Sequence, residues 1–566
     1  MQMSAAGTPG YDRRTVLRKL SGLGIGSVVF QRALAAEVEA AQAISPEMIQ
    51  QAEWVAGITL SEDDRGETAS AVQRQLVGIK AMHAIDVPYE VAPAVAFHPA
   101  APGKELVIQR QARAFESAAG QLPDKREDLA FLPVTELAAL IRTRKVSSME
   151  LTKMYLERLH EFNQQLHCVV NFTEEVALRQ ARQADREIEA GRYRGPLHGI
   201  PWGAKDLIDY PGYPTTWGAA PFREQKRANT ATVARRLEDA GAVLVAKLSL
   251  GALAMGDRWF GGMTRNPWDV KQGSSGSSAG SAAATAAGLV GFTLGSETLG
   301  SIVSPCRRCG TSGLRPTFGR VSRHGCMPLS WSMDKIGPIC RSIEDCALVF
   351  DAIHGRDGLD ETVVDRPFQW PPARDIRTLR VGYIPNRTPD KERDELTVLK
   401  ELGVQLVPIE LPQRFPANAM TLILDAEAAT VFDELTRQGV TEGLNQWPKI
   451  WRAARYISAV EYLRANRLRS MLLVEMNKLF QQVDLYVGGN DLVITNLTGH
   501  PTAVLPDGFA VRDDVRRPYS LTFTGRMYGE SDLLAVAHAY QQATGHHLEH
   551  PSLQVVPADP KSEVSE

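Results

Sequence analysis

Three side chains in this sequence have the types and surroundings needed for a serine nucleophile that works without histidine. Lys205 follows an apolar stretch, Ser277 lies in the small-residue run 276–284, and Ser301 lies 24 residues after Ser277 in the segment 297–302. Burial would lower the pKa of Lys205, because an apolar environment disfavours the charged amine. A neutral Lys205 could then accept a proton from Ser277, which could in turn accept one from Ser301.

The chemistry that this arrangement serves is attack on an amide carbonyl. Such a reaction needs an activated nucleophile, donors for the oxyanion and a proton for the departing nitrogen. We assign Ser301 as the nucleophile, Lys205 as the base and Ser277 as the bridge that later returns a proton to the leaving nitrogen. The predicted oxyanion hole consists of the backbone N–H groups of Thr298, Leu299, Gly300 and Ser301, which share one turn.

Other serine-containing patterns compete with this assignment. Residues 276–280 fit the GxSxG pattern, which would make Ser278 the nucleophile, but that pattern needs a buried strand where residues 266–272 are polar and contain a proline. Residues 332–335 fit SxxK, but its partner motifs SDN and KTG are absent from the sequence. A flexible linker would also be rich in Ser and Gly. The alanines at 282–287 instead predict a helix.

Two motifs raise the question of a metal site. Residues 546–550 fit HxxEH without an evident third ligand, and Cys306 and Cys309 form a CxxC without a second pair. We therefore predict no metal and no organic cofactor. The six cysteines do not indicate a disulfide scaffold in a chain of this length, and the sequence leaves open a local disulfide between Cys306 and Cys309.

Helices and apolar strands must hold the serine loops in place. Residues 242–246 and 289–294 predict buried strands, and 281–287 predict a helix between the two loops. Thr135 and Ser147 are predicted N-caps of the first helices. The alternation of the two element types predicts an α/β fold whose sheet is covered by helices on both faces. Further predicted elements are strands at 379–384, 404–411 and 485–487, a helix at 390–402 and a helical region at 417–482.

Composition limits the classes of partner. The chain has 566 residues, is 44% hydrophobic and 23% charged, and carries a net charge of −3, which are values typical of a globular protein. No basic surplus favours nucleic acid. No apolar run approaches the roughly 20 residues that a membrane-spanning helix needs. We therefore expect neither a nucleic-acid partner nor stable membrane insertion.

The first 36 residues have the order of an export signal. A twin arginine at Arg13 and Arg14 precedes a short apolar stretch at 20–30 and a small-x-small site at 33–35. We expect residues 1–36 to be a twin-arginine signal that directs the protein to the periplasm or the extracellular space. A basic tail without a targeting role is the alternative.

Six segments taken in order resemble the amidase signature family. The resemblance covers about residues 129–551 and implies the amidase signature fold, with a central mixed β-sheet covered by helices on both faces. It also implies a Ser-cis-Ser-Lys triad of Ser301, Ser277 and Lys205. The segments that carry it are GIPxxxKD at 199–206, SSxGSAAA at 277–284, GSI at 300–302, GLRPT at 313–317, GRVS at 319–322 and TGHP at 498–501.

The resemblance divides the chain and also has departures. Residues 1–36 are the expected signal, 37–127 an N-terminal helical extension with helices near 46–58 and 68–85, 128–552 the amidase domain and 553–566 a tail. Where the family commonly has Asp-Thr-Gly-Gly-Ser-Ile-Arg, this chain has residues 297–303 with Glu, Leu and Val at the first, third and last places. Glu297 with Val303 resembles the branch that contains peptide amidases. Ser275 and Ala279 also replace glycines of the bridging loop.

We predict an amidohydrolase that cleaves a linear carboxamide to the acid and ammonia or an amine through an acyl-enzyme on Ser301. The alternatives are the glutaminase subunit of a tRNA-dependent amidotransferase and a non-catalytic binding protein of the same fold. The expected partner is a small-molecule or peptide amide bound near Met255 and Gly256 and near helices around 447–462. Peptide, aryl and aliphatic amides all stay open, as does the oligomeric state, a homodimer included.

Overall fold

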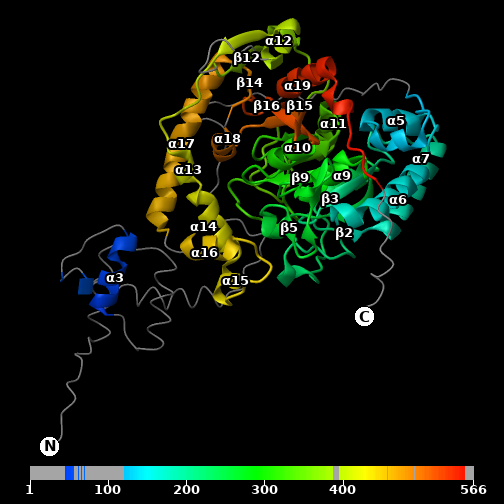
Figure 1. The fold of residues 1–566 in the computed structure, drawn as a ribbon. Coiled ribbons are helices and arrows are strands. Elements are labelled where there is room, and N and C mark those ends of the chain that lie inside the picture. The colour runs from blue at the N-terminus through cyan, green and yellow to red at the C-terminus, as the bar shows by residue number, and fades with distance from the viewer. Residues whose placement is uncertain are drawn as a thin grey trace, which may run out of the picture. The chain divides into compact units, whose positions relative to one another are not determined.

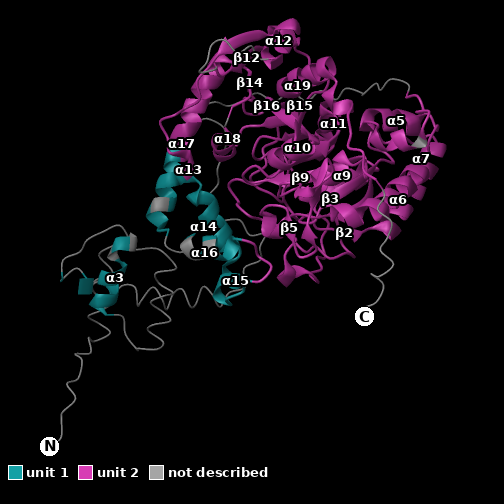
Figure 2. Cartoon of the chain, in the orientation of Figure 1, with its two compact units in different colours: residues 1–91, 419–441, 446–468 teal, residues 92–418, 442–445, 469–566 magenta. Residues whose placement is uncertain are grey.

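The computed structural model describes residues 45–56, 62, 65, 66, 69, 120–385, 394–454, 457–489 and 491–554 (Figure 1). The chain divides into two compact units: the first comprises residues 1–91, 419–441 and 446–468, and the second comprises 92–418, 442–445 and 469–566 (Figure 2). Helix α3 (Pro46–Ala56) agrees with the predicted helix at 46–58. The expected signal at 1–36 lies outside the described residues, as do nearly all of the predicted helix at 68–85 and most of the C-terminal tail.

The second unit is built on an eleven-stranded mixed sheet. Parallel pairs lie near its two ends and antiparallel pairs lie between them. In spatial order the strands are β13 (Gln405–Pro408), β12 (Arg380–Tyr383), β14 (Leu485–Val487), β16 (Val515–Gly525), β15 (Thr502–Arg512), β10 (Ser312–Arg315), β11 (Lys335–Cys340), β9 (Phe292–Glu297), β3 (Pro201–Lys205), β4 (Val243–Leu248) and β2 (Val169–Phe172).

Strands β9, β3 and β4 position the site. Each residue of β3 and β4 is buried, as expected for parallel strands covered on both faces. Because β3 runs parallel to β9, their carboxyl ends, Lys205 and Glu297, lie at the same edge of the sheet. The predicted strand at 242–246 is confirmed. The one predicted at 289–294 begins three residues later, because Leu289 and Val290 are buried in the core before β9 starts.

Helices cover both faces of this sheet, as predicted (Figure 1). The small residues of α9 let it pack closely: a Cβ at Gly280 would lie 2.5 Å from the Cys168 carbonyl oxygen. The helices of this unit are α5 (Val134–Arg142), α6 (Ser148–Leu166), α7 (Glu174–Glu189), α8 (Thr232–Asp239), α9 (Ala279–Ala286), α10 (Val303–Cys309), α11 (Ile343–Ile353), α12 (Asp394–Glu401), α18 (Leu492–Thr498), α19 (Glu530–Thr544) and the C-terminal half of α17 (Ala459–Gln482).

The two predicted N-caps have different outcomes. Ser147 caps α6 with a capping box, in which Ser147 Oγ accepts from the Glu150 N–H at 3.1 Å. The Thr135 prediction is wrong, because α5 begins at Val134 with Pro133 as its N-cap. The Thr135 N–H instead donates to Asp345 Oδ1 at 3.1 Å, so a side chain 210 residues away satisfies this end of the helix.

The described part of the first unit is mainly helical. Trp447 and Trp451 stack with ring centroids 5.7 Å apart, and Phe432 lies 5.3 Å from Trp451. These aromatic residues therefore pack within their own unit. No helix among the described residues is long and apolar enough to cross a membrane. Besides α3, the helices here are α14 (Leu422–Val431), α15 (Asp433–Arg437), α16 (Trp447–Ala454) and the N-terminal half of α17.

Candidate active site

Lys205 lies at the carboxyl end of β3 and is completely buried. Its Nζ donates to Ser277 Oγ at 2.8 Å, to Ser296 Oγ at 2.9 Å and to Ser278 Oγ at 3.0 Å. Burial lowers the pKa of Lys205 to about 7, although the nearby carboxylates of Asp334 and Glu297 act in the opposite direction. A large share of these amines is therefore neutral at physiological pH and able to accept a proton.

Ser277 follows a cis peptide bond to Gly276 and is buried. The loop is held from outside: the Ser275 N–H donates to Asp257 Oδ2 at 3.0 Å, and a Cβ at Gly276 would lie 1.9 Å from the Gly256 carbonyl oxygen. Only glycine fits at position 276. Ser277 Oγ is thereby fixed at hydrogen-bond distance from Lys205, where the sequence placed the bridging serine.

Ser278, the serine of the GxSxG pattern, is fully buried. Its Oγ donates to the Ser296 carbonyl at 3.1 Å and accepts from the Ser296 N–H at 3.2 Å and from Lys205. The Ser278 hydroxyl is therefore committed to holding the cis loop against β9. This arrangement agrees with the choice of Ser301 as the nucleophile.

Ser301 lies in the turn between β9 and α10 and is 8% exposed. Its carbonyl accepts the Ser278 N–H at 3.1 Å, which ties the two serine loops together. Gly300 has φ +92°, a left-handed conformation that favours glycine. Within the described structure, the N–H groups of Leu299, Gly300 and Ser301 donate to no protein acceptor. They are available to an oxyanion.

Glu297 anchors this turn from below. Its Oε2 accepts the N–H groups of Ile302 and Val303 at 2.8 and 2.9 Å. Its Oε1 accepts from Arg315 Nη1 at 2.8 Å and from Asn496 Nδ2 at 2.7 Å. Burial alone would raise the pKa of Glu297, but the charge of Arg315 and further cationic and hydrogen-bonding groups outweigh it and lower that pKa to about 2.

Sequence reasoning missed Arg315 and Asn496 as partners of the nucleophile's turn. Arg315 supplies the guanidinium that Val303 lacks, and the signal for it was its place in the GLRPT segment. The Leu299 departure is tolerated because Leu299 does not adopt a positive φ. Ser275 does, at φ +63°, so the serine that replaces a family glycine keeps a backbone conformation that costs a non-glycine residue about 1–2 kcal/mol.

The remaining motifs serve packing. Ser332 of the SxxK pattern accepts from Arg469 Nη1 at 2.8 Å, and Lys335 Nζ donates to the Met333 carbonyl. In the HxxEH segment, Glu549 pairs with Arg516, and His550 stacks on Phe131 with ring centroids 3.7 Å apart.

All six cysteines are buried and free, so the structure has no disulfide between Cys306 and Cys309. Burial raises the pKa of both thiols, which keeps them protonated. Among the described residues no group of three or more His, Cys, Asp or Glu side chains could hold a metal ion.

The predicted substrate residues Met255 and Gly256 lie beside the cis loop. The Gly256 carbonyl packs against Gly276, and the Met255 carbonyl accepts from Asn445 Nδ2 at 3.0 Å. Their contact with substrate stays a prediction. The aromatic residues around 447–462 belong to the other unit.

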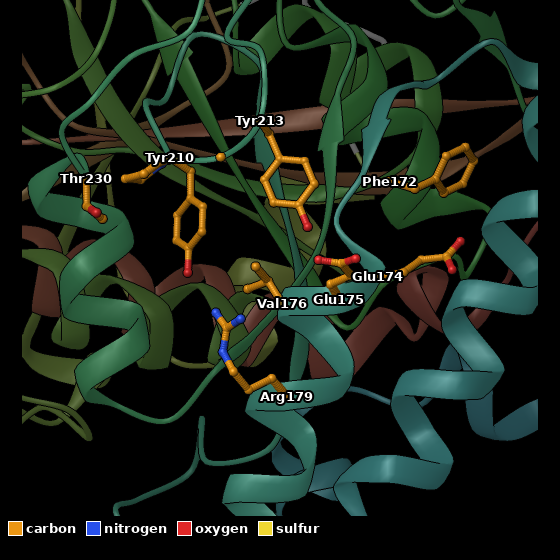
Figure 3. A pocket seen from close by; sticks show the side chains of 10 residues that line it. Phe172, Glu174, Glu175, Val176, Arg179, Tyr210, Tyr213 and Thr230 are labelled. Atoms are coloured by element: carbon orange, nitrogen blue, oxygen red, sulfur yellow. The ribbon is translucent and has the colours of Figure 1, made fainter.

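A cavity of about 710 Å³ opens where the loop after Asp209 faces the start of α7 (Figure 3). Tyr210 and Tyr213 line one wall, and Glu175 and Arg179 of α7 line the other. None of its lining residues belongs to the two serine loops or is Lys205. This cavity is therefore separate from the catalytic constellation.

Comparison with known proteins agrees with this site. Residues 150–489 match the sequence model of the family described as Amidase. A glutamyl-tRNA(Gln) amidotransferase subunit from Chloroflexus aurantiacus is 34% identical over 76% of this chain and 100% of that protein, and its counterpart from Moorella thermoacetica is 31% identical over 76% and 100%. The native peptide amidase from Stenotrophomonas maltophilia is 29% identical, with a TM-score of 0.64 over 73% of this chain and 97% of that one. The chain belongs to the amidase signature family, and its lysine and two serine loops are the parts that carry the signature.

Proposed function

We propose that this amidase cleaves a linear carboxamide to the acid and ammonia or an amine through an acyl-enzyme on Ser301. The observation that carries the proposal is the buried Lys205, whose pKa is about 7 and whose Nζ lies 2.8 Å from Ser277 Oγ. A base that is half neutral near pH 7 suits proton transfer at that pH. The unused N–H groups of the neighbouring turn supply the electrostatic part of catalysis.

The proposed reaction proceeds in two halves. Ser301 Oγ attacks the amide carbon while its proton passes to Ser277 and the Ser277 proton passes to Lys205. The carbonyl oxygen becomes an oxyanion that accepts from the N–H groups of the turn. As the C–N bond breaks, Ser277 donates a proton to the nitrogen and recovers one from Lys205. Water then attacks the acyl-enzyme by the same proton path and releases the acid.

A second candidate is the glutaminase component of an amidotransferase. The 34% identity to a glutamyl-tRNA(Gln) amidotransferase subunit over that protein's whole length favours it. Such a protein would use the same triad on glutamine. The two candidates therefore differ in substrate and in dependence on other subunits, while the chemistry at Ser301 is common to both.

The test is release of ammonia or amine from amidated peptides, anilides, aliphatic amides and glutamine by the isolated protein. We expect turnover of one amide class that Ser301→Ala abolishes, together with an acyl adduct on Ser301 detected by mass spectrometry of the trapped enzyme. Turnover of glutamine alone, and only with added partner subunits, would favour the second candidate. Unchanged turnover in Ser301→Ala would refute the assignment of the nucleophile.

A further inference from the structure

A second cavity, of about 990 Å³, lies entirely within the second unit. It forms where α10 meets the β15–β16 hairpin and the segment after β14. Its lining residues are Gln272, Ser275, Ser304, Arg307, Arg308, Glu395, Gly488, Gly489, Ala510, Arg512 and the strand residues 517–522.

The charge of this cavity is strongly positive. Its lining includes four arginines and one glutamate. Arg517 is neutralised by Asp269 at 2.7 Å. Within the described residues Arg307, Arg308 and Arg512 have no carboxylate partner.

Arg307 is the best placed of the three to bind a ligand. It is half-buried, its Nη2 makes a long contact of 3.3 Å to Thr522 Oγ1, and its Nε is buried without an acceptor. A buried donor without a partner is costly, and a bound acceptor would remove that cost. Arg308 donates to the neutral Gln272 Oε1 at 3.2 Å, and Arg512 is exposed on the hairpin. All three are thus free to face an anion.

The cavity reaches both serine loops. Ser275 lies two residues before Ser277, and Ser304 lies three residues after Ser301. The Ser304 hydroxyl also touches the oxyanion turn, because a Cβ at Gly300 would lie 2.9 Å from Ser304 Oγ. Arg307 is three residues further along α10, which is about 4.5 Å of helix rise. A short substrate could therefore span from the nucleophile to these guanidinium groups.

We propose that this cavity is an anion subsite, and that the amide substrate carries a carboxylate that Arg307, Arg308 and Arg512 bind. This inference rests on the proposed function and adds to it the chemical class of the substrate. The planar guanidinium matches a carboxylate with two parallel hydrogen bonds, and such charged pairs are stronger than neutral ones. A neutral amide of the same length would leave the orphaned Arg307 Nε without an acceptor.

The experiment measures kcat/KM for monoamides of dicarboxylic acids with three to six carbons, each beside a neutral amide of equal length and an ω-amino amide. The variants are Arg307→Ala, Arg307→Lys and Arg512→Ala, with Arg182→Ala on the exposed face of α7 as the matched control. In parallel, calorimetry measures the binding of the free dicarboxylates and of inorganic phosphate to Ser301→Ala.

We expect the acid amides to be preferred over neutral amides, with an optimum at one chain length. Arg307→Ala should reduce the ratio of kcat/KM for acid over neutral amides by about tenfold or more, the loss expected for one charged hydrogen bond. Arg512→Ala, whose exposed side chain supports no packing, should reduce that ratio by a smaller factor, and Arg307→Lys should recover part of it. Arg182→Ala should leave the ratio as in the wild type.

Hydrolysis of neutral and acid amides at equal rates, or a ratio that Arg307→Ala does not change, would overturn the inference while leaving the proposed function in place. Absence of all amide hydrolysis, with dicarboxylate binding that still requires Arg307, would overturn the proposed function and leave the anion subsite. Binding of phosphate but of no dicarboxylate would refute the substrate class, because the anion would then come from solution.

Discussion

Replacing Glu297 by glutamine should destabilise the second unit by about 3 kcal/mol. The side chain keeps its volume, so the change removes chiefly a charge that Arg315, Ile302 and Val303 contact. Both Glu297 and Arg315 are fully buried, and removing one partner of a buried pair typically costs about 3–5 kcal/mol because the other charge is left uncompensated.

The pKa gives an independent value for the same magnitude. The pKa of Glu297 falls from the ordinary 4.5 to about 2 on folding. A difference of roughly 2.5 units corresponds to about 3 kcal/mol, at 1.36 kcal/mol per unit. Because the folded pKa is the lower one, this stability is fully present above pH 4.5 and is lost as the pH falls toward 2.

The assay is urea unfolding of wild type and Glu297→Gln at pH 7, 5 and 3, followed by tryptophan fluorescence. The variant should lose about 3 kcal/mol at pH 7, and the deficit should shrink at pH 3, where the wild type loses the same contribution. Glu157→Gln, at an exposed position on α6, is the control and should unfold like the wild type. A loss below about 1 kcal/mol, or a deficit that does not depend on pH, would refute the argument from a buried charge pair.

Three further predictions concern catalysis and targeting. Because neutral Lys205 is the base, kcat/KM for a neutral amide should rise with pH through an apparent pKa near 7; Lys205→Arg, always charged, should be inactive at every pH, and activity that survives in it would exclude the lysine as base. Gly300→Ala should lower kcat about a hundredfold, since its Cβ would press on Leu492 and Ser304 at 2.9 Å and displace the oxyanion donors, whereas Gly191→Ala, at φ +76° with open space around it, should keep the wild-type kcat. Changing Arg13 and Arg14 to lysine should retain the protein in the cytoplasm by cell fractionation if residues 1–36 are an export signal, and unchanged secretion would contradict that proposal.

The fold class and the triad could be predicted from sequence because their signals are local. Continuous apolar runs such as 242–246 predict strands buried on both faces, and the small residues after Ser277 predict a helix that packs closely. Lys205 lies at the end of one strand and the Ser301 turn follows another. Since both strands are parallel, their ends meet without any further information.

The strand order could not be predicted in this way. The chain leaves the sheet after β11, builds β12 and β13 at one edge, and later inserts β14, β16 and β15 between them and β10. Nothing in the residues of a five- or six-residue strand encodes which neighbour it will find from hundreds of positions away. The same holds for the start of α5, where Asp345 replaces the cap that Thr135 was predicted to supply.

The Glu297 network shows why the missed residues matter for the chemistry. Four donors converge on one carboxylate, from the turn itself, from β10 and from α18, and these segments are brought together only by the sheet. By accepting the N–H groups of Ile302 and Val303, Glu297 directs the start of α10 and so sets the orientation of the preceding N–H groups at Leu299, Gly300 and Ser301. An oxyanion hole gains its effect from donors that need no reorganisation during the reaction. A glutamate held by an arginine on a neighbouring strand fixes those donors as firmly as an arginine within the turn would, so Val303 and Glu297 are compatible with an active enzyme.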